Sequence, residues 1–135
     1  MRHIVLASHG NLAAGMKSSV ELIAGAQPGL ATVCAYTEEC PTAAEPLAVL
    51  VKGLAEGDEL IIVTDVLGGS VNNEASQFVN APGVYVVTGM NLAFVLSLVV
   101  DAGTPTAELI GESVAEAREQ LRRMDPVPDA DEDDF

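Results

Sequence analysis

Short apolar runs alternate with longer amphipathic stretches along the chain. Four of the runs are rich in Val or Ile and short enough to be buried strands, at residues 4–7, 32–36, 60–64 and 84–88. Between them, apolar residues recur at helical spacing, as in residues 12–23 before Gly25 and residues 43–54 before Gly57. The pattern therefore predicts four strands that alternate with helices.

This alternation is typical of an α/β domain with three layers, α/β/α, in which helices cover both faces of a mainly parallel four-stranded sheet. In such sheets, functional residues follow the carboxyl ends of the strands. A further helix is predicted at residues 106–119, whereas residues 120–124 fit either a helix or a strand. We expect the functional residues directly after Ala7, Tyr36, Thr64 and Thr88.

The composition indicates one domain with an acidic surface. The chain has 135 residues, enough for a single hydrophobic core, and 49% of them are hydrophobic. The net charge is −14, and six of the last eleven residues are acidic. An acidic surface disfavours nucleic acid and anionic membranes, and it suits a basic protein partner. Residues 1–124 are predicted as the domain and residues 125–135 as an acidic, disordered tail.

Cysteine spacing and the apolar runs indicate the cellular setting. Cys34 and Cys40 lack the spacing of a zinc site or a redox motif, so we expect free thiols. The chain enters its first strand without a basic and then apolar leader, and its longest apolar run, residues 92–100, is too short to span a membrane. These features predict a soluble cytoplasmic protein without direct membrane insertion.

Two polar motifs follow the first and third predicted strands. The first strand ends in SHGN, residues 8–11, and the third ends in TDVLGGS, residues 64–70. If these strands are neighbours, His9 and Asp65 can meet at one edge of the sheet. A nucleophilic histidine needs one bare ring nitrogen, and a carboxylate that accepts the other N–H fixes that tautomer. Asp65 could supply this carboxylate.

The glycines after the third strand suit a phosphoryl group. Gly68 and Gly69 let backbone N–H groups approach an anion at the start of a helix, and Ser70 adds a hydroxyl donor and an expected N-cap. The alternative is that His9 only ends a strand, that Asp65 caps a helix and that the glycines only form a tight turn. The chemistry alone leaves both interpretations open. Complete nucleotide-binding glycine motifs are absent from the sequence, which gives little support to nucleotide binding.

The motifs together resemble the mannose/fructose/sorbose-family enzyme IIA domains of the sugar phosphotransferase system (PTS), over residues 1–124. The family pattern D-x-x-G-G-[ST]-x-x-N has counterparts for all its fixed positions within residues 65–73, and the pattern G-x-N has them in Gly89 and Asn91. Val71 departs from the family, where Pro is frequent. Asn11 and Leu67 stand on the expected docking surface where one family member has large aromatics, so partner choice could differ while the phosphoryl chemistry should be kept.

The resemblance implies a phosphohistidine relay, without a cofactor or a metal. The phosphocarrier protein HPr would phosphorylate His9, on Nε2, and His9 would then phosphorylate an enzyme IIB that acts with membrane components IIC and IID. Asp65 would orient His9, and Ser70 would donate a hydrogen bond to the phosphoryl group. The expected phosphate-binding and docking residues are Gly10, Asn11, Leu67, Gly68, Gly69, Met90 and Asn91.

The resemblance also implies a homodimer, in which residues 120–124 would be exchanged as a fifth, antiparallel strand. Two other functions stay open: a subunit that serves dihydroxyacetone kinase, and a regulatory module whose phosphorylation state is sensed without transport. His3 lies inside the first strand, and we expect a structural role for it. Asn72 and Asn73 suit a packing role or a site role equally well.

Overall fold

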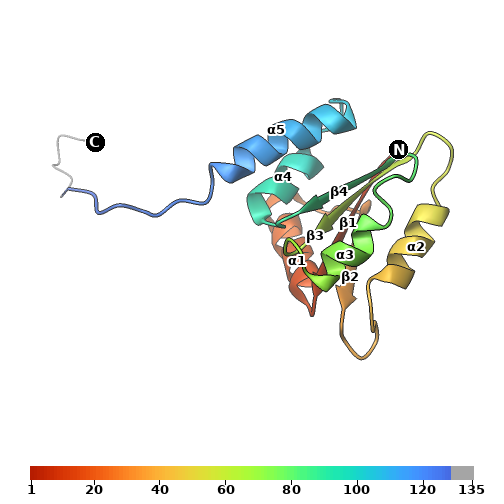
Figure 1. Ribbon diagram of the computed structural model, residues 1–135. Helices are drawn as coiled ribbons and strands as arrows, with labels where there is room; N and C mark the ends of the chain where they lie inside the picture. Colours follow the sequence, from red (N-terminus) through yellow and green to blue (C-terminus); the bar gives the residue numbers. More distant parts are fainter. Residues whose placement is uncertain (129–135) are drawn as a thin grey trace.

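The strands and helices alternate along the chain in the predicted order (Figure 1). The computed structural model describes residues 1–128. The strands are β1 (Arg2–His9), β2 (Leu30–Ala35), β3 (Glu59–Thr64) and β4 (Val84–Thr88). The helices are α1 (Leu12–Ala24), α2 (Ala44–Lys52), α3 (Ser70–Ser76), α4 (Leu92–Val100) and α5 (Thr106–Arg118). The predicted α/β class and its four strands are confirmed.

All four strands run parallel in the order β2-β1-β3-β4, which places β1 at the centre of the sheet between β2 and β3. His9 pairs with Ala35 of β2, and Ala7 pairs with Thr64 of β3. These registers bring the carboxyl ends of β1, β2 and β3 to the same edge. The condition for His9 and Asp65 to meet, neighbouring first and third strands, is therefore fulfilled.

Each face of the sheet has its own hydrophobic core. Alternate residues of β1 point to opposite faces, so Ile4 and Leu6 join the core under α1 and α4, whereas Val5 and Ala7 join the core under α2 and α3. Helix α5 packs on α4 and covers the core under α1 and α4. Figure 1 shows α4 and α5 together on one side of the sheet. The strand ends are thereby held by helices on both faces.

The chain beyond α5 leads away from the sheet in Figure 1. Residues 121–128 form neither helix nor strand. The exchange of residues 120–124 as a fifth strand requires a second chain, so it stays a prediction. Most of the expected acidic tail, residues 129–135, lies outside the described residues. Within residues 1–128, no helix combines the length and apolar character needed to cross a membrane.

Candidate functional site

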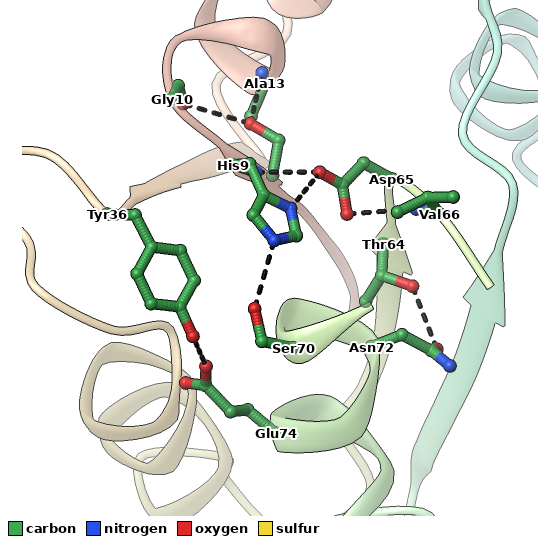
Figure 2. A network of polar contacts seen from close by, with 11 residues as sticks. His9, Gly10, Ala13, Tyr36, Thr64, Asp65, Val66, Ser70, Asn72 and Glu74 are labelled. Carbon is green, nitrogen blue, oxygen red and sulfur yellow. Dashed lines mark hydrogen bonds and ion pairs between the residues drawn. The ribbon is translucent and has the colours of Figure 1, made fainter. Parts of the chain in front are cut away.

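The candidate site lies where β1 and β3 end. His9 is the last residue of β1, and Asp65 directly follows β3. The Nδ1 atom of His9 lies 2.7 Å from Oδ2 of Asp65, and the backbone N–H of His9 donates to the same oxygen, also over 2.7 Å (Figure 2). The carboxylate of Asp65 thus contacts both the ring and the backbone of His9.

Asp65 carries a negative charge under ordinary conditions. Its side chain is only 9% exposed, and this burial opposes ionisation. Hydrogen bonds from the backbone N–H of His9, the His9 ring and the backbone N–H of Val66 outweigh the burial and hold the pKa of Asp65 below its usual value. An ionised Asp65 accepts the Nδ1–H, so Nε2 of a neutral His9 keeps its lone pair.

Ser70 lies at the other ring nitrogen of His9. Its Oγ is 3.0 Å from Nε2. The expectation that Ser70 is the N-cap of its helix is wrong: Gly69 occupies the N-cap position, and α3 begins at Ser70. The backbone of Gly69 is extended and that of Ser70 is already helical, and the hydroxyl of Ser70 contacts His9. His9 is therefore contacted at Nδ1 by a carboxylate and at Nε2 by a hydroxyl.

The glycine turn between β3 and α3 packs closely against His9. Gly68 has a φ of +78°, which side chains disfavour. A Cβ at Gly69 would lie 2.9 Å from Cγ1 of Val66 and 3.3 Å from Cε1 of His9. The absence of a side chain at Gly69 thus leaves the space that the imidazole occupies.

Ser8 stabilises the turn that follows His9, a role that the sequence analysis did not assign. Its buried Oγ accepts a hydrogen bond from the backbone N–H of Ala13 and donates one to the carbonyl of Gly10. The side chain therefore joins the start of α1 to the turn after His9, where Gly10 has a φ of +59°. Its position directly before His9 was the available sequence signal.

Tyr36 is a second residue that the sequence analysis did not assign to the site. It directly follows β2, and its ring stacks on the imidazole of His9 with the ring centroids 5.2 Å apart and the planes inclined by 22°. Its hydroxyl donates to Oε1 of Glu74 in α3 (Figure 2). This hydrogen bond to a carboxylate raises the pKa of Tyr36. The sequence analysis took Tyr36 as the last residue of the second strand and expected functional residues only after it, whereas β2 ends at Ala35.

The other expected residues surround the site or support it. Asn11 is exposed after the turn, and Leu67 is 78% exposed beside the glycines. Asn91 caps α4 through the backbone N–H of Phe94, and Met90 packs against the core. Three further polar residues have partners other than His9: Asn72 accepts from Thr64, Asn73 donates to Gly68, and His3 pairs with Asp58.

The site is open to a large partner. The side chain of His9 is 44% exposed, and the exposed apolar side chains of Leu12, Val66 and Leu67 belong to the loops and the helix start beside it.

Cys34 and Cys40 are both free thiols, as the sequence predicts. Within residues 1–128, His, Cys, Asp and Glu form no group of three or more that could hold a metal ion.

Fold and site define a class of protein: a small parallel α/β domain with an exposed histidine–aspartate pair at the carboxyl edge of its sheet. The chain belongs to the PTS system fructose IIA component family, whose model matches residues 3–120. It is therefore a component of the sugar phosphotransferase system, with a phosphotransfer role in sugar transport. No curated protein matches the chain.

Solved structures show the same architecture. A protein from Klebsiella pneumoniae described as a phosphoenolpyruvate-dependent sugar PTS permease is 40% identical, with 90% of each chain covered and a TM-score of 0.83. The PTS IIA protein associated with the fucose utilization operon of Streptococcus pneumoniae is 27% identical over 90% of this chain and 96% of its own, with a TM-score of 0.68. A mannose/sorbose-specific IIA subunit from Enterococcus faecalis shares the fold at 24% identity, with a TM-score of 0.83 and 96% and 98% coverage.

Proposed function

We propose that His9 accepts a phosphoryl group on Nε2 from HPr and passes it to an enzyme IIB. The observation that carries this proposal is the 2.7 Å contact between Nδ1 of His9 and the ionised Asp65. This contact leaves Nε2 as the nucleophile on an exposed side chain. Membership in a phosphotransfer family supports the same assignment.

The transfer is a substitution at phosphorus. The lone pair of Nε2 forms a new N–P bond while the bond between phosphorus and the donor's nitrogen breaks, and the electron pair of that bond stays with the donor. The proton on Nδ1 remains, so the phosphorylated ring carries a positive charge that Asp65 stabilises. Ser70, whose Oγ lies 3.0 Å from Nε2, and the N–H groups after the glycine turn would donate to the phosphoryl oxygens. The transfer to enzyme IIB reverses these bond changes.

The proposed partners follow from the family and from the surface. HPr and enzyme IIB would dock in turn around His9, over Gly10, Asn11, Leu67, Gly68, Gly69, Met90 and Asn91, and IIC and IID would act downstream. Residues 1–124 form the proposed domain, which acts in the cytoplasm as a homodimer. The relay needs neither a cofactor nor a metal.

Phosphorylation from a defined mixture tests the proposal. Enzyme I, HPr and labelled phosphoenolpyruvate should give an acid-labile phosphohistidine on the protein, and His9→Ala should remove the label. His3→Ala is the matched control, because His3 pairs with Asp58 through a 3.1 Å contact in the same strand. Undiminished labelling of the His9→Ala variant would overturn the site assignment.

The acceptor separates the transport role from its alternatives. Isolated phosphorylated protein should pass its label to an enzyme IIB and leave the nucleotide-binding subunit of dihydroxyacetone kinase unlabelled. The double glycine after β3 favours this outcome, because we expect the dihydroxyacetone kinase subunits to have a different turn there, without the double glycine. Label transfer to the kinase subunit alone would replace the sugar role. Label transfer to neither acceptor would favour a regulatory module.

A further inference from the structure

Tyr36 has an unfavourable backbone conformation at the edge of the site. Its φ is +59°, and among residues 1–128 it is the only non-glycine residue with a positive φ. Bulky side chains rarely adopt this conformation, because it brings Cβ against the backbone. Such strain persists only where the surrounding structure imposes it, and it is concentrated at functional sites. The conformation of Tyr36 therefore calls for an explanation in its contacts.

Two elements contact the side chain of Tyr36, and a third holds one of these contacts in place. Its ring stacks on His9 at the end of β1, and its hydroxyl donates to Oε1 of Glu74 in α3. The other oxygen of Glu74 accepts from the backbone N–H groups of Ala43 and Ala44 at the start of α2, over 2.8 and 2.7 Å. Glu74 is thus fixed by α2. In turn it fixes the hydroxyl end of the Tyr36 ring, the contact that Figure 2 shows.

We propose that Tyr36 is a positioning residue for phosphoryl transfer and that Glu74 holds it against His9. The inference rests on the proposed function, in which Nε2 of His9 carries the phosphoryl group. Two hydrogen bonds in the ring plane orient the free imidazole, one from Nδ1 to Asp65 and one between Nε2 and Ser70. Once Nε2 is bonded to phosphorus, it has no lone pair for Ser70, and only the bond to Asp65 remains at the ring.

The stacked Tyr36 ring provides a restraint that does not depend on Nε2. It lies against the face of the imidazole, so it resists rotation of His9 about its Cβ–Cγ bond before and after transfer. The phosphorylated ring is cationic, and a cation within about 6 Å of an aromatic centroid is stabilised by the π electrons. The stacking contact is therefore stronger in the phosphorylated state than in the neutral one. Glu74 contributes by directing the tyrosine hydroxyl away from Nε2.

A docking role is the competing explanation, because Tyr36 is 46% exposed. A residue that only contacts HPr would change KM for HPr and leave kcat unchanged. A positioning residue would change kcat and leave KM nearly unchanged. The two explanations therefore give different kinetics for the same substitution.

The test compares Tyr36→Leu, which removes the aromatic face but retains the same backbone strain, with Tyr36→Phe, which retains the face. With phosphorylated HPr as donor, we expect Tyr36→Leu to lower kcat about 2- to 30-fold, the range of a cation–π contact, with KM nearly unchanged. Tyr36→Phe also loses the hydrogen bond to Glu74, so it should restore only part of kcat. Tyr85→Phe is the matched control, since Tyr85 donates to Glu59 over 3.1 Å on β4. An unchanged kcat for Tyr36→Leu, or a change in KM alone, would overturn the proposal.

Glu74→Gln tests the second half of the proposal and does not depend on the folding of Tyr36→Leu. It should lower kcat less than Tyr36→Leu, because an amide oxygen still accepts one hydrogen bond but without the charge. An unchanged kcat would show that Glu74 does not hold Tyr36.

Carbon-13 relaxation at Cε1 of His9 in the unphosphorylated protein separates this inference from the proposed function. Asp65 sets the Nδ1–H tautomer, which should be the same in every variant, whereas the motion of the ring should be greater in Tyr36→Leu than in the wild type, with Tyr36→Phe between the two. If the wild type accepts no label from HPr, the proposed function fails and the ring motion still decides whether Tyr36 positions His9. Equal ring motion in Tyr36→Leu and the wild type would exclude the positioning role.

Discussion

One carboxylate oxygen of Asp65 accepts two hydrogen bonds from His9, from the ring Nδ1 and from the backbone N–H, each over 2.7 Å. The second oxygen of Asp65 accepts from the backbone N–H of Val66 over 2.9 Å. The side chain therefore joins the end of β1 to the turn after β3 and orients the imidazole with the same atom. Rotation of the ring would break the Nδ1 contact, while the backbone contact would still hold Asp65 at the strand end.

Replacement of Asp65 by Asn should keep the fold and slow phosphoryl acceptance. An amide can present its NH₂ group to Nδ1, which stabilises the tautomer with the proton on Nε2 and blocks the nucleophile. We expect a loss on the order of 10²- to 10⁴-fold in the rate of labelling from phosphorylated HPr. Asp58→Asn is the control, since it changes the other aspartate–histidine pair of β1. A rate within about twofold of the wild type would contradict the orienting role.

Ser70→Ala should cause a smaller loss than Asp65→Asn. The substitution removes one hydroxyl donor, and a hydrogen bond to a charged group contributes about 1.5–3 kcal/mol. This corresponds to a decrease of about 10- to 150-fold in the transfer rate if the whole contribution is made in the transition state. Time-resolved labelling with phosphorylated HPr as donor measures this transfer rate. Ser76→Ala, at the end of the same helix, serves as control because Ser76 donates only to the carbonyl of Asn72.

The sequence predicted the layers of the fold because its signals are local and repeated. Val- and Ile-rich runs and helical spacing mark every strand and most of the helices, and parallel connection rules then place the strand ends at one edge. His9 and Asp65 could be paired on this basis because each stands at the carboxyl end of a strand. The pairing needed only the knowledge that β1 and β3 are neighbours, which the topology provides.

The contacts of Ser8, Tyr36 and Glu74 could not be predicted in the same way. The stacking of Tyr36 on His9 depends on a positive φ that no Gly or Asn announces in the sequence. Glu74 reaches Ala43 and Ala44 across 30 residues of chain, so the contact follows from the packing of α3 beside α2. Ser70 has the composition of an N-cap, yet its hydroxyl serves the imidazole. At Ser70 the tertiary contact with His9 thus replaces the helix-capping contact that its residue type predicts.

Gly69→Ala should disturb the site more than the fold. The new Cβ would lie 2.9 Å from the end of the Val66 side chain, which is exposed and can move, but also 3.3 Å from Cε1 of His9. We expect a stability loss of about 1–3 kcal/mol from overpacking and a decrease of up to about 10²-fold in transfer as the imidazole shifts. Thermal unfolding and the labelling assay measure the two effects.

The control for Gly69→Ala is Gly15→Ala. Gly15 lies in the interior of α1, and a Cβ there would meet nothing within 4 Å. Alanine forms helices better than glycine, so the folding stability of this variant should rise by about 0.5–1 kcal/mol while its transfer rate stays unchanged. Equal effects of the two substitutions on transfer would contradict the specific packing of Gly69 against His9.

Acid should weaken the fold in part through Asp65. The pKa of this carboxyl is lowered in the folded protein, so around that pKa the unfolded chain binds more protons than the folded one, and stability decreases as the pH falls. The contribution is complete above the unfolded pKa, about 3.9, and is lost as the pH falls through the lower folded value. Urea titrations between pH 7 and pH 3 measure the free energy of unfolding. At neutral pH this free energy should be lower for Asp65→Asn than for the wild type, and the difference should shrink below about pH 4. Asp125→Asn, at an exposed position, should follow the wild type throughout. A difference between wild type and Asp65→Asn that stays constant to pH 3 would show that the carboxylate of Asp65 does not stabilise the fold through its charge.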